Sequence, residues 1–186
     1  GITGAQRAAV EDYLAQNRDV SVWLPVCQEN VDASAGALGH SAALFALDDQ
    51  TAFRRMVDLR ERKSGAAITV PDEGVVITEK LSELLDVSVG DSITIENDGR
   101  RVSAPVTGIA ENYVKHYIYL TEGYYERLFG AAPQENSILL AFAGGVTAEA
   151  KDDTSVALMK LDGVGSYSSI ATLRDTFENS MSAINY

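Results

Sequence analysis

Residues 89 to 120 read VGDSITIENDGRRVSAPVTGIAENYVKHYIYL, and no other part of the chain is so strongly patterned. Hydrophobic and polar residues alternate from Ser92 to Glu96 and from Arg101 to Ile109, which is typical of strands with one buried face. Asn97-Asp98-Gly99 between them predicts a tight hairpin turn, because glycine adopts a positive φ without a Cβ clash. Tyr117 to Leu120 predicts a further strand, so we expect a small antiparallel sheet in this part of the chain.

Helices are expected on either side of this sheet. Thr78 is a suitable N-cap for a helix that carries a stripe of leucines on one face. After the sheet, Thr121 can cap a second helix, which Gly130 ends. Residues 136 to 143 then form the most apolar run of the chain, and we expect a strand in the centre of its sheet there.

The N-terminal part predicts a helix followed by two strands. A capping box that begins at Thr3 predicts the helix. Residues 20 to 28 alternate and predict the first strand, in which Pro25 marks a sheet edge or the end of the strand. Residues 30 to 40 are rich in glycine, alanine and serine and predict a loop. Residues 41 to 47 predict the second strand, antiparallel to the first.

The C-terminal part predicts a helix, a short strand and a last helix. Hydrophobic residues recur at helical spacing from Val146 to Leu161, and residues 164 to 168 predict the strand. From Ile170 to Ile184 a spacing of three and four residues predicts a helix that runs almost to the end of the chain without a cap. We therefore expect an excised domain whose first and last helices lie side by side, so that both chain ends leave it together.

These elements predict the α+β class. One lobe is expected from the chain ends, residues 1 to 70 with 131 to 186, as a mixed sheet with packed helices. A smaller antiparallel β-rich lobe, residues 71 to 130, is inserted in the middle. We expect residues 1 to 186 to form a single domain with these two sub-lobes.

The composition limits the class of protein and its partners. Of 186 residues, 46% are hydrophobic and 23% are charged, which is enough for an ordinary buried core. The net charge of −12 repels phosphate backbones, so we expect no nucleic-acid partner. Cys27 is the only cysteine, which excludes an internal disulfide and a cysteine-based metal site. We expect Cys27 to be a small buried side chain on a strand. No run of the sequence approaches the ~20 apolar residues of a membrane span.

Catalytic patterns are missing from the sequence. His40 and His116 are the only histidines, and no metal-binding spacing, nucleophile elbow or phosphate loop is present. We expect no enzyme activity, no metal and no cofactor. The alternative is a hydrolase, which would need one of these histidines beside a nucleophile and an acid in an open pocket.

One local group of side chains is suited to binding. Three tyrosines, a histidine, an amide and a carboxylate lie close together in sequence and could form an interaction surface. The members of this 111–119 cluster are Glu111, Asn112, Tyr113, His116, Tyr117 and Tyr119. The alternative is a bend between strands, in which Asn112 serves the turn and the tyrosine rings cover the sheet.

A second candidate is a group of basic residues after the second predicted strand. Asp48 or Asp49 can cap a helix there that turns Phe53, Met56 and Val57 inward. The members of this basic patch are Arg54, Arg55, Arg60, Arg62 and Lys63. A helix dipole favours cations near the C-terminus by ~0.3–1 kcal/mol each, so a solvated helix end is one interpretation. A docking patch for an acidic partner is the other.

The middle of the chain resembles a known family. GVVITEKLSELLDVSVGDSITI (residues 74 to 95), ENYVKHYIYL (111 to 120), TEGYYERLFG (121 to 130) and NSILLAF (136 to 142) resemble the extracytoplasmic domain of FtsX-like ABC transporter permeases, the MacB-type periplasmic core domain. LRERKSG, residues 59 to 65, is similar to the variants common in Gram-positive bacteria. The resemblance covers residues 59 to 142 well. At the two chain ends it is limited to the general arrangement of the predicted elements.

This resemblance implies a non-enzymatic domain at the outer face of the cell membrane, anchored by flanking transmembrane helices. Such a domain would transmit ATPase-driven conformational change, or engage substrate or partner proteins outside the membrane. The implied partners are the transmembrane helices of the same permease, a cytoplasmic ATPase subunit, a second permease, and a peptide, lipoprotein or hydrophobic cargo. No cofactor is implied. The residues alone leave open the alternative of a free-standing secreted ligand- or peptide-binding module.

Overall fold

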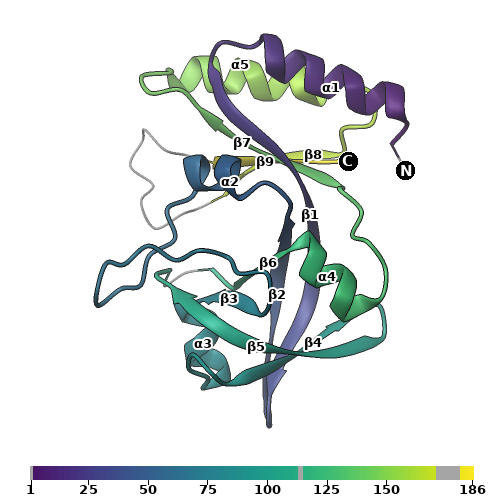
Figure 1. The fold of residues 1–186 in the computed structure, drawn as a ribbon. Coiled ribbons are helices and arrows are strands. Elements are labelled where there is room, and N and C mark those ends of the chain that lie inside the picture. The colour runs from purple at the N-terminus through teal and green to yellow at the C-terminus, as the bar shows by residue number, and fades with distance from the viewer. Residues whose placement is uncertain (1, 113–114, 171–180) are drawn as a thin grey trace. The chain divides into compact units, whose positions relative to one another are not determined.

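The computed structural model describes residues 2 to 112, 115 to 170 and 181 to 186 (Figure 1). Within these ranges the chain forms five helices and nine strands, which confirms the α+β class. None of these described helices is both long and apolar enough to cross a membrane. The chain divides into two compact units: unit 1 contains residues 1–25, 51–57 and 136–186, and unit 2 contains residues 26–50 and 58–135.

Unit 2 is built on a closed ring of six strands. The strand β1 (Val20–Ala35) enters this unit at Val26. The strands follow one another in the order β1-β2-β6-β3-β5-β4, and β4 pairs again with β1. The other members of the ring are β2 (Leu38–Leu47), β3 (Val75–Thr78), β4 (Ser92–Asn97), β5 (Arg100–Ala110) and β6 (Tyr117–Thr121).

This closed ring of strands is a barrel, and it contains both antiparallel and parallel strand pairs. β1–β2, β1–β4, β3–β6 and β4–β5 are antiparallel, whereas β2–β6 and β3–β5 are parallel. The predicted β4–β5 hairpin is confirmed, with Asp98 at φ 49° and Gly99 at φ 78° in its turn. Two consecutive positive φ values are typical of a type I′ turn, which suits the twist of paired strands. The expected antiparallel sheet is therefore one part of a mixed barrel.

Two helices lie at opposite ends of the barrel. α3 (Glu79–Leu85) follows β3 directly, and α4 (Glu122–Phe129) follows β6 directly. Because β3 and β6 are antiparallel, their C-terminal ends point to opposite ends of the barrel. Leu81 and Leu85 of α3 and Phe129 of α4 belong to the same buried core as the barrel strands.

The caps of these two helices are built differently. The Thr121 hydroxyl accepts a hydrogen bond from the Tyr124 N–H at 3.1 Å, and Gly130 at φ 76° ends α4, as predicted. Thr78 occupies the N-cap position of α3, but its hydroxyl makes no capping bond. It donates to the Lys115 carbonyl at 2.6 Å and accepts from the Tyr117 N–H at 3.0 Å. Thr78 therefore ties α3 to the start of β6.

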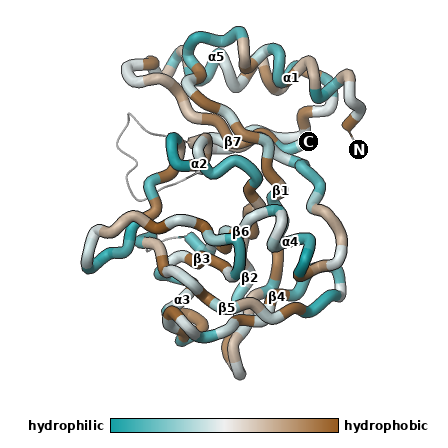
Figure 2. Tube along the Cα trace, in the orientation of Figure 1, coloured by the Kyte–Doolittle hydropathy of each residue, from teal (hydrophilic) through white to brown (hydrophobic). Residues whose placement is uncertain are grey.

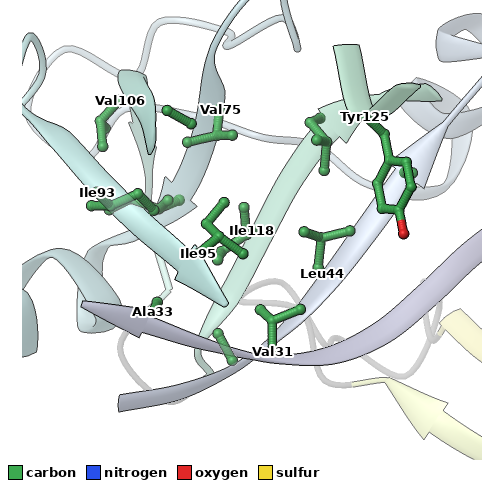
Figure 3. Packing of buried hydrophobic residues seen from close by; sticks show 14 of the residues in the cluster. Val31, Ala33, Leu44, Val75, Ile93, Ile95, Val106, Ile118 and Tyr125 are labelled. Carbon is green, nitrogen blue, oxygen red and sulfur yellow. The ribbon is translucent and has the colours of Figure 1, made fainter. Parts of the chain in front are cut away.

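The interior of the barrel is filled by hydrophobic side chains from all six strands (Figure 3). Leu44 of β2, Ile95 of β4 and Ile118 of β6 lie together there, and each is fully buried with 0% exposure. Burial of one such side chain contributes about 1.5–3 kcal/mol. Ile93 and Ile95 face inward, as the alternation in the sequence predicts.

Unit 1 contains a sheet in the order β1-β7-β9-β8, to which β1 contributes its first residues. β7 pairs antiparallel with β9, and β9 pairs antiparallel with β8. All of β7 is buried and it lies between β1 and β9, which confirms the predicted central strand. The elements of this unit are α1 (Gly4–Gln16), α2 (Gln50–Met56), β7 (Ser137–Phe142), α5 (Ala148–Met159), β8 (Ser166–Ile170) and β9 (Met181–Asn185).

The helices α1 and α5 lie side by side on one face of this sheet (Figure 1). Val10 and Leu14 of α1 and Leu158 of α5 share a buried core with Ile138 and Leu140 of β7. In Figure 2 both helices carry a mixture of hydrophilic and hydrophobic residues, as expected for helices with one buried side. The predicted capping box at the start of α1 is present.

The predicted loop over residues 30 to 40 is wrong. β1 continues to Ala35 and pairs with β2 from Cys27–Ala46 to Ala35–Leu38, so this stretch is a long hairpin. Alanine, serine and glycine have low strand propensity, which hides the strand in the sequence. Cross-strand hydrogen bonds stabilise it instead. The antiparallel arrangement of the two strands is confirmed.

The prediction of a last helix is also wrong for the residues of this segment that the structure describes. Residues 181 to 185 form β9, and residues 171 to 180 lie outside the described residues. Met181 to Ile184 are all buried, because β9 lies between β7 and β8, and this pairing overrides the helical spacing. The first helix nevertheless lies beside the last residue, since the guanidinium carbon of Arg7 is 5.6 Å from the ring centre of Tyr186.

The two units divide the chain at other residues than expected. Residues 26 to 50 and 58 to 70 were expected in the lobe made by the chain ends, but they belong to unit 2. The physical reason is the pairing of β2 with β6, which brings the N-terminal hairpin into the barrel. Residues 131 to 135 also belong to unit 2.

Candidate functional site

The 111–119 cluster lies on the connection from β5 to β6 and on β6 itself. Asn112 is buried, and its side-chain oxygen accepts a hydrogen bond from the Lys115 N–H at 3.0 Å. Its carbonyl accepts from the Lys80 N–H at 3.1 Å, in the first turn of α3. Asn112 therefore serves the turn between the strands, which is one of the two interpretations of the sequence.

The tyrosines of β6 pack against Phe45 of β2. Because Ile118 faces the barrel core, Tyr117 and Tyr119 face the opposite side of the strand. The ring centre of Phe45 lies 5.2 Å from that of Tyr117, edge to face, and 5.7 Å from that of Tyr119, stacked. Tyr119 is only 4% exposed, and burial raises the pKa of its hydroxyl, which stays protonated. Such ring pairs contribute about 0.5–1.5 kcal/mol, so these side chains stabilise the barrel wall.

His116 lies just before β6 and contacts the other histidine of the chain. Its ring centre is 4.2 Å from that of His40, with an angle of 41° between the planes. The His116 carbonyl accepts from the Ala43 N–H at 2.9 Å, which extends the β2–β6 pairing. Burial, followed by the charges of His40, Lys80 and Lys115, lowers the pKa of His116 and so favours its neutral form.

Only part of the 111–119 cluster can form a surface. Asn112 and Tyr119 are buried, and Tyr113 lies outside the described residues. The three members with partly exposed side chains are Glu111, His116 and Tyr117. A role in partner contact stays a prediction for these residues.

The basic patch does not gather at one helix end. α2 ends at Met56, so only Arg54 and Arg55 lie in its last turn, in unit 1. Arg60, Arg62 and Lys63 follow in unit 2, where no helix dipole favours them. The inward orientation predicted for the hydrophobic residues is confirmed, because Phe53, Met56 and Val57 are buried.

Arginines of the patch contact nearby groups of the chain. The Arg60 Nε lies 2.7 Å from the Asp58 Oδ2, and the Arg62 Nε lies 2.7 Å from the Glu79 Oε1. Arg55 donates to the Ser21 carbonyl at 3.2 Å. Exposed ion pairs contribute about 0–1 kcal/mol, so these contacts orient the side chains without strongly stabilising the fold. Docking of an acidic partner stays a prediction.

A partly buried polar network lies at the α4 end of the barrel. Glu29 of β1 accepts hydrogen bonds from the Tyr125 hydroxyl and from the Asn97 side-chain amide. The Cys27 thiol donates to the same carboxylate at 3.2 Å. Burial alone would raise the pKa of Glu29, but these three donors outweigh it and hold the pKa below its usual value. The charged carboxylate therefore joins α4 to β1 and β4.

This network was not predicted from the sequence, although one signal could have shown it. Glu29 has the same strand parity as Cys27 and Val31, which both face the barrel interior, so the alternation places a carboxylate inside. The prediction of a loop from residue 30 hid that parity. Burial raises the pKa of the Cys27 thiol, which stays protonated, and Cys27 has the buried strand position that was expected.

Glu122 begins α4 near this network. One of its carboxylate oxygens is buried and has no hydrogen-bond partner among the described residues. Burial, followed by the charges of Glu135 and Asp48, raises the pKa of Glu122 to about 7. The helix N-terminus acts in the opposite direction, because it favours an anion. Near neutral pH, both the protonated and the ionised form of Glu122 are therefore populated.

The described residues offer little catalytic geometry. In residues 2–112, 115–170 and 181–186, no three histidine, cysteine or acidic side chains are grouped to hold a metal ion. The His40 Nδ1 lies 2.7 Å from the Ser41 carbonyl, and its ring contacts His116. A hydrolase triad needs a nucleophile and a carboxylate in these positions.

Comparison with known proteins gives similarities of structure. A comparison with sequence models of protein families gives no match for the chain, and a comparison with curated proteins gives none either. The extracellular domain of the noncanonic ABC-type transporter YknZ from Gram-positive bacteria is 14% identical, with a TM-score of 0.49, over 79% of this chain and 76% of that chain. The periplasmic region of MacB from Actinobacillus actinomycetemcomitans is 13% identical, also with a TM-score of 0.49, over 100% of this chain and 85% of that chain.

At these identities and TM-scores, the similarity by itself assigns no function to this chain.

Proposed function

We propose that this chain is a non-enzymatic extracytoplasmic domain of an FtsX-like ABC transporter permease. The main support is the sequence resemblance over residues 59 to 142. Its segments coincide with complete structural features: residues 74 to 95 include β3, α3 and most of β4, and residues 121 to 130 are α4 with both caps. Similarity that follows caps and turns identifies a fold pattern, so it bears on the class of protein more than on a binding site.

Two features of the structure suit a domain that transmits motion. A barrel with a close-packed interior resists deformation, so unit 2 can move as one body. In unit 1, the contact between Arg7 and Tyr186 brings the first helix beside the end of the chain. Membrane helices that flank the domain would then join it at neighbouring points. Under this proposal, the cytoplasmic ATPase acts through those helices, and the domain passes the change to a substrate or partner protein.

The parent reading frame tests the class of protein. Apolar segments of about 20 residues directly before Gly1 and after Tyr186 are expected for the permease. A signal peptide before the domain and a stop codon after it would support the secreted binding module instead. A neighbouring gene for an ATPase subunit is the second expected observation.

The proposed contact surface is tested in the intact transporter. His116→Ala and Tyr113→Ala should impair transport or signalling, while circular dichroism shows an unchanged fold. Val89→Ala is a suitable control, because Val89 is 59% exposed and lies outside the 111–119 cluster. If the cluster variants function as the control does, these residues have a packing role only.

A further inference from the structure

The fold brings the only two histidines of the chain together at the α3 end of the barrel. Their ring centres are 4.2 Å apart, with 41° between the planes. β2 and β6 are parallel neighbours, so residues that precede their paired segments lie at the same barrel end. His40 lies near the start of β2, and His116 directly precedes β6. No sequence spacing predicts this pair, because the two residues come from distant parts of the chain.

The hydrogen bond of His40 determines which of its nitrogens carries the proton. Nδ1 lies 2.7 Å from the Ser41 carbonyl oxygen, which can only accept, so Nδ1 must be the donor. In the neutral ring, Nε2 then keeps its lone pair. A ligating histidine in metal sites typically donates its other ring N–H to a carbonyl or carboxylate in this way. His40 is an exposed residue.

Charged side chains lie around the two rings. His116 itself is partly buried, and a metal ion binds only the neutral form of an imidazole. Lys80 and Lys115 act against a bound cation by their charge. Asp32 and Glu96 line a hollow with His40 but without His116, and their charges favour a cation near the His40 ring. Arg101 also lines the hollow and pairs with Glu96 at 3.3 Å.

We propose that His40 and His116 form a two-histidine site for a divalent transition-metal ion of the zinc, copper and nickel group. His40 would ligate through Nε2, and water would complete the coordination. Imidazole nitrogen suits these ions, whereas magnesium and calcium prefer oxygen ligands. With only two protein ligands, the affinity should lie well below that of a four-ligand structural zinc site. The site is independent of the assignment to a transporter.

Titration of the domain with Zn²⁺, followed by calorimetry, tests the site. Wild type should bind one ion, and His40→Ala and His116→Ala should each weaken binding by about tenfold or more, at least the loss typical for second-shell changes. Mg²⁺ should give no signal. Cys27→Ser is the matched control, because a cysteine sulfur can also bind these metal ions. The variant should bind Zn²⁺ like wild type, since Cys27 is buried. Binding that is equal in wild type and in either histidine variant would overturn the proposal.

A second measurement covers the case in which His116→Ala fails to fold. Sub-stoichiometric Cu²⁺ should broaden the NMR signals of both imidazole rings in wild type, because a paramagnetic ion acts only on nearby nuclei. His116→Gln keeps a polar side chain of similar length and should remove the broadening of His40. Asp32→Asn should leave both signals broadened. Broadening of surface carboxylate residues alone, with the histidines unaffected, would show non-specific binding and refute the two-histidine site.

Discussion

Replacing Tyr125 by phenylalanine removes one hydroxyl from the network around Glu29 and leaves the ring in place. The Glu29 carboxylate keeps its bonds from the Asn97 amide and the Cys27 thiol. A hydrogen bond to a charged group contributes about 1.5–3 kcal/mol. Because Glu29 is partly exposed and two donors remain, we expect a value at the lower end, about 1.5 kcal/mol for Tyr125→Phe.

Urea and thermal unfolding measure this loss. For a chain of this length, ~1 kcal/mol corresponds to about 2–4 °C in Tm, so the variant should melt roughly 3–6 °C below wild type. Because the chain has two units, hydrogen exchange of amides in β1 and α4 should be measured as well, to locate the loss in unit 2.

The pH dependence identifies the carboxylate as the partner. The folded pKa of Glu29 lies below its ordinary value of 4.5, so its contribution is present above pH 4.5 and is lost as pH falls through the folded pKa. The difference between wild type and Tyr125→Phe should shrink over the same range. It should also shrink in a Glu29→Gln background. An equal loss at pH 3 and pH 7, or in both backgrounds, would show that the hydroxyl acts through packing alone.

Other substitutions test α4 and the barrel. Glu122 has a folded pKa of about 7 against an ordinary 4.5, so its charged form is disfavoured in the folded state and stability should fall as pH rises between these values. Glu122→Gln should remove this part of the profile in urea unfolding from pH 4 to 8, and an unchanged profile would contradict it. Gly74→Ala should cost about 1–3 kcal/mol more than Gly90→Ala in urea unfolding. Both glycines have positive φ, 88° and 98°, but only a Cβ at Gly74 would lie 2.4 Å from the Thr107 Cγ2. Leu44→Ala should cost about 2–5 kcal/mol by the same assay, and a loss below about 1 kcal/mol would contradict its central place in the core.

The local parts of the fold could be predicted from the sequence. The β4–β5 hairpin, the caps of α1 and α4, and the buried strand β7 each depend on residues that are close together in the chain. Asp98-Gly99 is one example, because the turn needs two positive φ values and these residues accept them. Capping likewise involves residues only three positions apart, as in Thr121 and Tyr124.

The parts that were missed depend on distant pairing. Residues 30 to 35 form a strand because β2 lies beside them, and residues 181 to 185 form a strand because β7 and β8 lie on either side. Spacing within one segment carries no information about such neighbours. The candidate site was limited in the same way, because the burial of Tyr119 depends on Phe45 from β2.

Within the described part of unit 2, every barrel strand has a neighbour on both sides. An unpaired strand edge is a template for pairing with another chain, so closure of the barrel protects unit 2 from edge-to-edge association. The protection is weakest where the ladders are shortest: β3–β6 joins only Val76–Tyr119 and Ile77–Ile118, and β1–β4 joins three residue pairs. Opening either one creates two exposed edges at once. The rate at which the barrel opens and becomes able to self-associate therefore depends on these two short ladders more than on the long β1–β2 hairpin.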